Sequence, residues 1–250
     1  MPNNTKIFIC AHKDFDIPDD LSTELYSIIT NGIDLGDKSP CKTIIVPESY
    51  KNDLNGNNDL EYSEMYMIRY LYEHQDLISD LDYIGFCHYR RYFGFRNELP
   101  KLGAEEQNDC VLAKPMLMVP YGQYNVCHSI EDLNIFIDIV KQVDESIGIE
   151  FVKYLNGNRL YICNMFVINK DMFNQMMSIL VKVIDLFVSK ICNIQEHVNK
   201  HKERYKHCIN NDTKRYQRRV IAYLAERFTG FYISRFSRNP FITECLFIGH

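Results

Sequence analysis

The hexapeptide His88-Tyr-Arg-Arg-Tyr-Phe93 is the stretch of this sequence with the clearest chemical potential. An arginine guanidinium carries a fixed positive charge and a rigid fork of donors that fits pairs of phosphate oxygens. Histidine adds a hydrogen-bond donor or a proton-transfer group near neutral pH. Arg90 and Arg91 would point opposite ways on an extended chain, whereas in a turn both could face one ligand. The block therefore predicts an anion site. The alternative is that the arginines pair with carboxylates and the aromatic neighbours Tyr89, Tyr92 and Phe93 fill the core.

Two other apolar runs also carry polar residues. Residues 6–11 (KIFICA) read as a buried strand that delivers His12 and Lys13, and residues 161–168 (YICNMFVI) read as a strand that contains Asn164. Residues 83–87 (YIGFC) form a third such run and lead directly into the hexapeptide. Ligands of open α/β sheets bind beyond the carboxyl ends of the strands. We therefore expect the functional site where these strand ends meet.

Familiar catalytic and nucleotide-binding signatures are missing from the sequence. It contains no GxGxxG, GxxxxGK[ST], GxSxG or HExxH motif, and none of its nine cysteines forms a CxxC pair. Asp-x-Asp occurs as Asp14-Phe-Asp16 and Asp80-Leu-Asp82, and only the first follows a predicted strand. We predict reduced, mostly buried thiols and no metal site, with a divalent cation such as Mn²⁺ or Mg²⁺ left open as an alternative.

Composition indicates a globular protein. The chain has 250 residues, 46% of them hydrophobic and 24% charged, with a net charge of −5, which excludes disordered, collagen-like and coiled-coil chains. No apolar run approaches the roughly 18 residues that cross a bilayer, and the N-terminus lacks the features of a signal peptide, so we expect a cytoplasmic protein. Residues 197–238 hold 11 of the 28 Lys/Arg and 3 of the 33 Asp/Glu residues. This basic segment predicts an anionic partner or, alternatively, a solvated helical surface.

Strands alternate with helices over most of the chain. Beside the three runs above, we predict strands at residues 43–46, 111–113 and 117–119, and helices at residues 62–75, after a capping box at 129–132, after Asp171, and at 214–235. This order predicts an α/β sheet domain over residues 1–192, with a basic, helical C-terminal segment, residues 193–250, packed on the same domain.

Five pieces of the sequence, in this order, resemble one known family. They are Ala11-His12-Lys13, Tyr62-Ser63-Glu64, the run from Tyr83 through the hexapeptide to Phe93, Asn164-Met-Phe-Val-Ile168, and Arg219-Val-Ile-Ala-Tyr-Leu-Ala-Glu-Arg227. Together they are similar to a family of bacterial glycosyltransferase-like proteins from capsule and O-antigen loci, long catalogued as a domain of unknown function. The hexapeptide is the most specific piece, and the match covers nearly the whole chain.

The resemblance implies a GT-A-like nucleotide-sugar fold and the transfer of a sugar, galactose or galactofuranose among the candidates, from a UDP-sugar donor. It implies that Ala11, His12 and Lys13 lie by the nucleotide and that His88, Arg90 and Arg91 lie by the diphosphate or the reacting centre. It also implies that Asn164 and Met165 face the donor sugar and that Glu226 and Arg227 close the site from the last helix. Glu64 and Tyr89 join the nucleotide-sugar group. The acceptor would be a polysaccharide or a lipid-linked oligosaccharide.

A nucleoside diphosphate gains negative charge as it leaves, and most GT-A enzymes offset this charge with a divalent ion held by Asp-x-Asp. Here the position after the third strand holds His88-Tyr-Arg90-Arg91, so we expect metal-independent stabilisation by the two arginines, with Lys13 as a further candidate. An inverting transferase also needs a general base, for which Asp132, Glu64 and Glu226 are candidates. An ion pair between Glu226 and Arg219 is the competing structural role.

The basic region from Lys200 to Arg219 would face anionic lipid or a pyrophosphate-linked acceptor, which predicts peripheral contact with the inner face of the cytoplasmic membrane. Two other functions compete with a transferase. One is a non-catalytic protein of the same fold that binds sugar nucleotides or glycans. The other is a nucleic-acid-binding module that uses the basic segment, and a sequence pI near 5.9 argues against it, so we expect no nucleic-acid partner.

Overall fold

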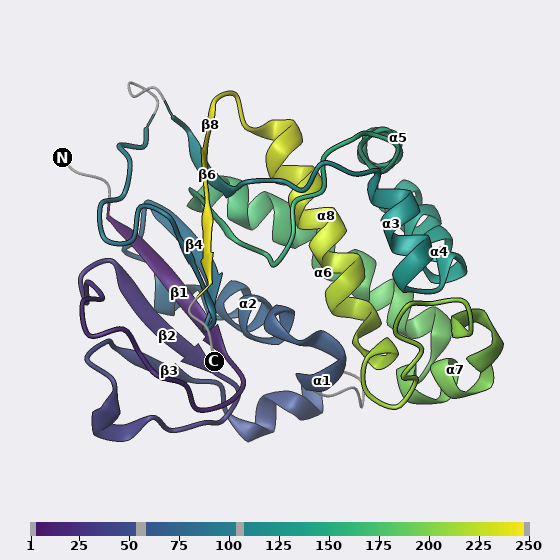
Figure 1. The fold of residues 1–250 in the computed structure, drawn as a ribbon, viewed down its shortest axis with the longest axis horizontal. Coiled ribbons are helices and arrows are strands. Elements are labelled where there is room, and N and C mark those ends of the chain that lie inside the picture. The colour runs from purple at the N-terminus through teal and green to yellow at the C-terminus, as the bar shows by residue number, and fades with distance from the viewer. Residues whose placement is uncertain (1–3, 54–58, 104–107, 248–250) are drawn as a thin grey trace.

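The computed structural model describes residues 4–53, 59–103 and 108–247, which form a mixed β-sheet with helices on one face (Figure 1). The main path through the sheet has the order β3-β2-β1-β4-β7-β6-β8, and β5 and β9 join it beyond the end of β4. The strands are β1 (Thr5–Ala11), β2 (Tyr26–Thr30), β3 (Thr43–Ile45), β4 (Tyr83–His88), β5 (Arg91–Phe93), β6 (Cys110–Ala113), β7 (Phe166–Asn169), β8 (Pro240–Thr243) and β9 (Cys245–Phe247). The predicted mixed α/β architecture is confirmed.

The parallel part of the sheet sets the position of the site. β1 pairs in parallel with both β2 and β4, and β2 pairs in parallel with β3, so all four strands end at the same edge. β7 runs antiparallel to β4 and to β6. β4 then turns sharply into β5, with His88 opposite Arg91, and β5 pairs with the C-terminal strand β9. The hexapeptide therefore forms a tight hairpin at the carboxyl edge of the sheet.

Helices cover one face of the sheet (Figure 1). They are α1 (Asp59–Tyr62), α2 (Glu64–Glu73), α3 (Pro120–Cys127), α4 (Ile130–Val143), α5 (Glu145–Leu155), α6 (Lys170–Ile191), α7 (Ile194–Lys200) and α8 (Val220–Phe236). Side chains alternate along β1, so Phe8 and Cys10 join the helical core while Ile7 and Ile9 face a second apolar cluster. Loops before and after β2 and the segment after β5 supply much of that second cluster.

α6 is the longest helix among the described residues. By length and composition it could span a membrane, a weak indication because the core helix of a globular protein passes the same test. Its apolar stripe, which includes Phe173, Leu180 and Phe187, is fully buried in the helical core. α8 packs beside α6 and α5, so the basic C-terminal segment rests on the helices of the preceding part.

Several expected elements differ from the structure. Residues 117–119 form no strand, because they lead into α3 with Leu117 81% exposed. The expected strand at 161–168 begins only at Phe166, since Cys163 (φ 69°) and Asn164 (φ 47°) adopt left-handed backbone that a strand cannot accommodate. Asn169, not Asp171, caps α6 by accepting from the Met172 N–H at 2.8 Å. The C-terminal segment is also not purely helical, because it supplies β8 and β9. The boundary at residue 192 stays a prediction.

Candidate active site

A cavity of about 390 Å³ opens beyond the carboxyl ends of β1 and β4. Its walls come from the end of β1, the β4–β5 hairpin, the start of α2, the turn before β7, and the first turns of α8 with the segment before them. The lining residues are His12, Lys13, Glu64, His88, Tyr89, Arg90, Arg91, Cys163, Arg215, Tyr216, Arg219, Ala222, Tyr223 and Glu226. Residues predicted from separate strand ends therefore meet in one place.

A second, larger cleft of about 660 Å³ adjoins this cavity. The two share Lys13, Tyr89 and Arg90, and the cleft continues along the loop after β1. Its other lining residues are Asp14, Phe15, Asp16, Ile17, Asp19 and Lys38. A ligand of extended shape can therefore lie in the cleft and reach past Lys13 and Arg90 into the cavity.

The β4–β5 hairpin fixes the protonation of His88. The backbone N–H of Arg90 donates to Nδ1 of His88 at 3.2 Å, so Nδ1 carries no proton and the neutral ring carries its proton on Nε2. Burial lowers the pKa of His88 well below its usual range, and the positive charges of Arg91 and Arg90 lower it further. Burial and neighbouring cations likewise lower the pKa of His12. Both rings are neutral donors or acceptors at physiological pH.

The two arginines of the hexapeptide contact aromatic rings instead of carboxylates. Arg90 lies over the ring of Tyr89, 5.1 Å from its centroid, and Arg91 lies over Phe247 at 5.2 Å. Neither forms an ion pair with any carboxylate in the described part of the chain, and Arg91 Nε is buried with no hydrogen-bond partner there. The hairpin thus presents two guanidinium groups to one cavity, which favours the anion site over the carboxylate alternative.

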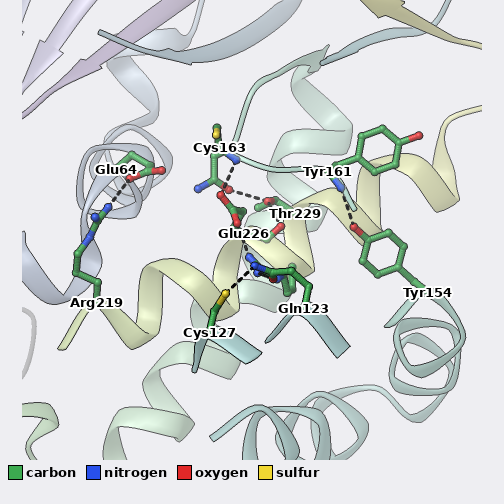
Figure 2. A network of polar contacts seen from close by, with 11 residues as sticks. Glu64, Gln123, Cys127, Tyr154, Tyr161, Cys163, Arg219, Glu226 and Thr229 are labelled. Atoms are coloured by element: carbon green, nitrogen blue, oxygen red, sulfur yellow. Dashed lines mark hydrogen bonds and ion pairs between the residues drawn. The ribbon is translucent and has the colours of Figure 1, made fainter. Parts of the chain in front are cut away.

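Glu64 is held at the cavity by Ser63 and Arg219. Arg219 Nη2 donates to Ser63 Oγ at 2.6 Å, and that hydroxyl donates to Glu64 Oε2 at 2.6 Å. Figure 2 shows Arg219 reaching from the α8 side toward Glu64. Burial alone would raise the pKa of Glu64, but the Ser63 hydrogen bond and the Arg219 charge outweigh it and lower the pKa, so Glu64 is ionised. Ser63 has φ 51°, a strained value for a residue with a side chain.

Glu226 lies under the strained turn that precedes β7 (Figure 2). Its Oε2 accepts from the Cys163 backbone N–H at 2.5 Å, and its Oε1 accepts from Arg227. Burial raises the pKa of Glu226, although the neighbouring Arg227 opposes the shift. The competing structural role, an ion pair with Arg219, is not formed, since Arg219 contacts Ser63 and Glu64 instead.

Other predicted site residues lie outside the cavity. Asp132 is completely buried under α7, where it accepts from His197 Nε2 at 2.8 Å and from the Tyr205 hydroxyl at 2.7 Å. This position corrects the expectation that Asp132 is a general base, because no acceptor hydroxyl can reach it. Ala11 is buried in β1 and can contribute only through its backbone.

The remaining three expected contacts are indirect. Asn164 is 4% exposed and its Oδ1 accepts from Thr229 Oγ1 at 2.7 Å, while Met165 is equally buried beside Cys245. Arg227 is 2% exposed and donates to Gln123 and Glu226, below the cavity floor. None of the three lines the cavity, which corrects the expectations that Asn164 and Met165 face the donor sugar and that Arg227 closes the site.

Sequence reasoning placed Glu226 on the α8 wall of the cavity but missed the other residues of that wall. Arg215, Tyr216 and Tyr223 line it, but Arg215 and Tyr216 come before the helix starts, in a segment with no motif. The one available signal was spacing, because Arg219, Tyr223 and Glu226 recur at helical intervals and therefore share one face.

The described residues do not fit a divalent metal at the hairpin. Arginines occupy the position after β4, and no group of three or more His, Cys, Asp or Glu side chains in the described ranges is arranged to hold an ion. In the adjoining cleft, Asp14 instead pairs with Lys38, with Oδ2 and Nζ 2.7 Å apart.

Comparison with known proteins supports the same architecture. A solved structure titled as the apo form of the bifunctional glycosyltransferase WbbM matches with a TM-score of 0.71 at 20% sequence identity. The match covers 99% of this chain and 46% of that one, so this chain spans slightly under half of the solved protein. The fold is therefore GT-A-like, as the sequence predicted. No curated protein matches the sequence.

A family model agrees with the resemblance noted in the sequence. It covers residues 6–238, which include both walls of the cavity. The chain therefore belongs to the family described as domain of unknown function DUF4422.

Proposed function

We propose that this protein is a glycosyltransferase that moves a sugar from a UDP-sugar donor to a polysaccharide or lipid-linked oligosaccharide acceptor. Galactose and galactofuranose are the first donors to examine, and capsule or O-antigen synthesis is the setting that the sequence resemblance suggests. The observation that carries the proposal is the cavity at the carboxyl edge of a GT-A-like sheet, where Arg90 and Arg91 lack carboxylate partners among the described residues.

The charges of the strand-side wall suit a nucleoside diphosphate. Lys13, Arg90 and Arg91 supply three cations, and two of them also line the adjoining cleft. We assign the nucleoside to that cleft and the diphosphate to its junction with the cavity. The donor sugar then projects into the cavity, toward Glu64 and the α8 wall. Fixed guanidinium groups stabilise charge that develops on a leaving group without needing to reorganise.

The reaction is a substitution at the anomeric carbon of the donor sugar. An acceptor hydroxyl oxygen forms the new bond to this carbon, while the bond from the carbon to the diphosphate oxygen breaks. The electron pair of the broken bond leaves with UDP, and its charge is met by Arg90 and Arg91. The hydroxyl proton passes to a carboxylate, for which we propose Glu64 because it is ionised and lines the cavity.

Glu226 suits a supporting role better than the role of general base. Both of its oxygens already accept hydrogen bonds, and burial raises its pKa. We propose that it fixes the strained turn at Cys163 and thereby the floor of the cavity. The exposed lysines Lys200 and Lys202 remain available for contact with an anionic membrane surface.

A donor panel tests the proposal. UDP release is measured with UDP-sugars in the presence of lipid-linked and soluble glycans, and UDP binding is measured by calorimetry. Release from one donor well above the hydrolysis background supports a transferase. UDP binding with no release from any donor would support a sugar-nucleotide-binding protein, and absence of both would remove the proposal.

A further inference from the structure

The α8 wall of the cavity has features that the donor does not use. Tyr216 and Tyr223 both stack on the buried ring of His128, with centroids 5.6 and 4.0 Å apart and interplanar angles of 13° and 26°. The packing of His128 restricts both tyrosine rings at the edge of the cavity. Tyr223 also lies under the guanidinium of Arg219, which is 5.4 Å from its ring centroid, so Tyr216 is the ring on which the apolar face of a sugar can stack.

Arg215 adds a positive charge beside this ring. It is exposed and lines the cavity next to Tyr216, and its side chain forms no ion pair within the described ranges. Arg219, one helical turn further, already serves Ser63 and Glu64. Lys13, Arg90 and Arg91 on the opposite wall suffice for a diphosphate. Arg215 is thus a cation in excess of what the donor needs, on the side from which the acceptor must approach Glu64.

We infer that the α8 wall is an acceptor subsite for an anionic glycan, in which a sugar stacks on Tyr216 and a neighbouring negative group pairs with Arg215. The inference rests on the proposed glycosyltransferase function and adds the chemical class of the acceptor. The negative group is a uronic acid carboxylate or the diphosphate of a lipid-linked glycan. Both present paired oxygens that match a guanidinium fork.

Three matched acceptors distinguish a uronic acid carboxylate from a diphosphate as the negative group. UDP release and donor affinity are measured with octyl galactoside, octyl galacturonide and galactosyl octyl diphosphate, using the wild type, Arg215→Ala, Tyr216→Ala and the control Lys214→Ala. Lys214 is an exposed neighbour outside the cavity lining. We expect Arg215→Ala to raise KM about tenfold for the preferred anionic acceptor only, because a charge-assisted hydrogen bond contributes about that factor. The preferred acceptor identifies the source of the charge.

The effects of Tyr216→Ala and Arg215→Ala on the KM for the acceptor must also differ. Tyr216→Ala should raise KM for neutral and anionic acceptors alike, and Lys214→Ala should change neither. An equal effect of Arg215→Ala on neutral and anionic acceptors, or no effect, would overturn the subsite. If no donor releases UDP, the proposed function fails. Calorimetric binding of the two anionic probes to wild type and Arg215→Ala then still decides whether the subsite exists.

Discussion

Glu64 and Glu226 face the same cavity in opposite electrostatic states. Arg219 and Ser63 hold the first ionised, whereas burial raises the pKa of the second. A general base must be deprotonated before it can take a proton, and its pKa sets the pH below which the rate falls. Two experiments can therefore tell which carboxylate takes the proton of the acceptor.

The first experiment replaces each carboxylate by its amide. Glu64→Gln should lower kcat by about 100- to 1,000-fold, because proton transfer is lost, while UDP binding stays within about twofold. Glu226→Gln should lower kcat less, since it disturbs only the turn at Cys163. Rates from UDP release and affinities from calorimetry measure both effects. A larger loss in Glu226→Gln would exchange the two roles.

The second experiment is the pH dependence of kcat/KM. The pKa of Glu64 lies below the ordinary value of 4.5, so the base stays ionised and the rate should be level from about pH 5.5 to 7.5. His88 adds no transition near pH 6.5, because its lowered pKa keeps it neutral throughout this range. The acid limb should appear only below pH 4.5. An acid limb above pH 4.5 would point to Glu226, whose pKa is raised.

At the scale of elements, Asp132 ties α4 to the basic segment that follows α6. It accepts hydrogen bonds from His197 on α7 and from Tyr205 in the next turn. Asp132→Ala should lower the free energy of unfolding by about 3 kcal/mol, because two buried donors lose their acceptor. Urea unfolding measures this change.

Asp138→Ala is the matched control, since Asp138 is exposed on the same helix and should change stability by less than about 0.5 kcal/mol. Folded Asp132→Ala should keep its kcat, because Asp132 lies outside the cavity. Loss of activity in a variant that is still folded would restore Asp132 as a candidate base.

α8 approaches the strained turn through Gly230. A Cβ at this position would lie 2.9 Å from Cβ of Tyr161 and 3.1 Å from its carbonyl oxygen, so the segment that leads to Cys163 would have to move. Gly230→Ala should cost about 1–3 kcal/mol of stability and also lower kcat, since the turn forms part of the cavity. Thermal unfolding and UDP release measure the two effects.

Gly122 in α3 provides the comparison for Gly230. A Cβ there meets only Val119, at 3.9 Å, so Gly122→Ala should leave both stability and turnover nearly unchanged. Equal behaviour of the two alanine variants would show that close packing at Gly230 does not position the turn.

For the whole molecule, the sequence predicted well which residues line the cavity from the edge of the sheet. It predicted poorly which residues line the opposite, α8 wall. Apolar runs such as residues 6–11 and 83–87 form buried strands. The polar residues that follow parallel strands must then meet at the carboxyl edge of the sheet. The left-handed backbone at Cys163 carries no local signal, because neither glycine nor a turn motif marks it. The burial of Asp132 depends on contacts with residues more than 60 positions away.

The cavity also combines parts of the chain that are distant in sequence. β1 and the hairpin contribute Lys13, Arg90 and Arg91, whereas α8 and the residues before it contribute Arg215 and Tyr216. In the proposed function, these two walls would bind the donor and the acceptor separately. In the proposed mechanism, the cations of the hairpin stabilise the charge of the departing UDP without a metal.

Turnover in excess EDTA tests this claim most directly. UDP release by the wild type, by the Arg90→Ala/Arg91→Ala double variant and by the control Arg235→Ala is compared with and without the chelator. Arg235 is an exposed arginine that pairs with Glu150 and does not line the cavity. The account predicts full wild-type and Arg235→Ala activity in EDTA and a loss of at least about 100-fold in the double variant. Activity that disappears in EDTA and returns with Mn²⁺, or a double variant that keeps wild-type turnover, would contradict it.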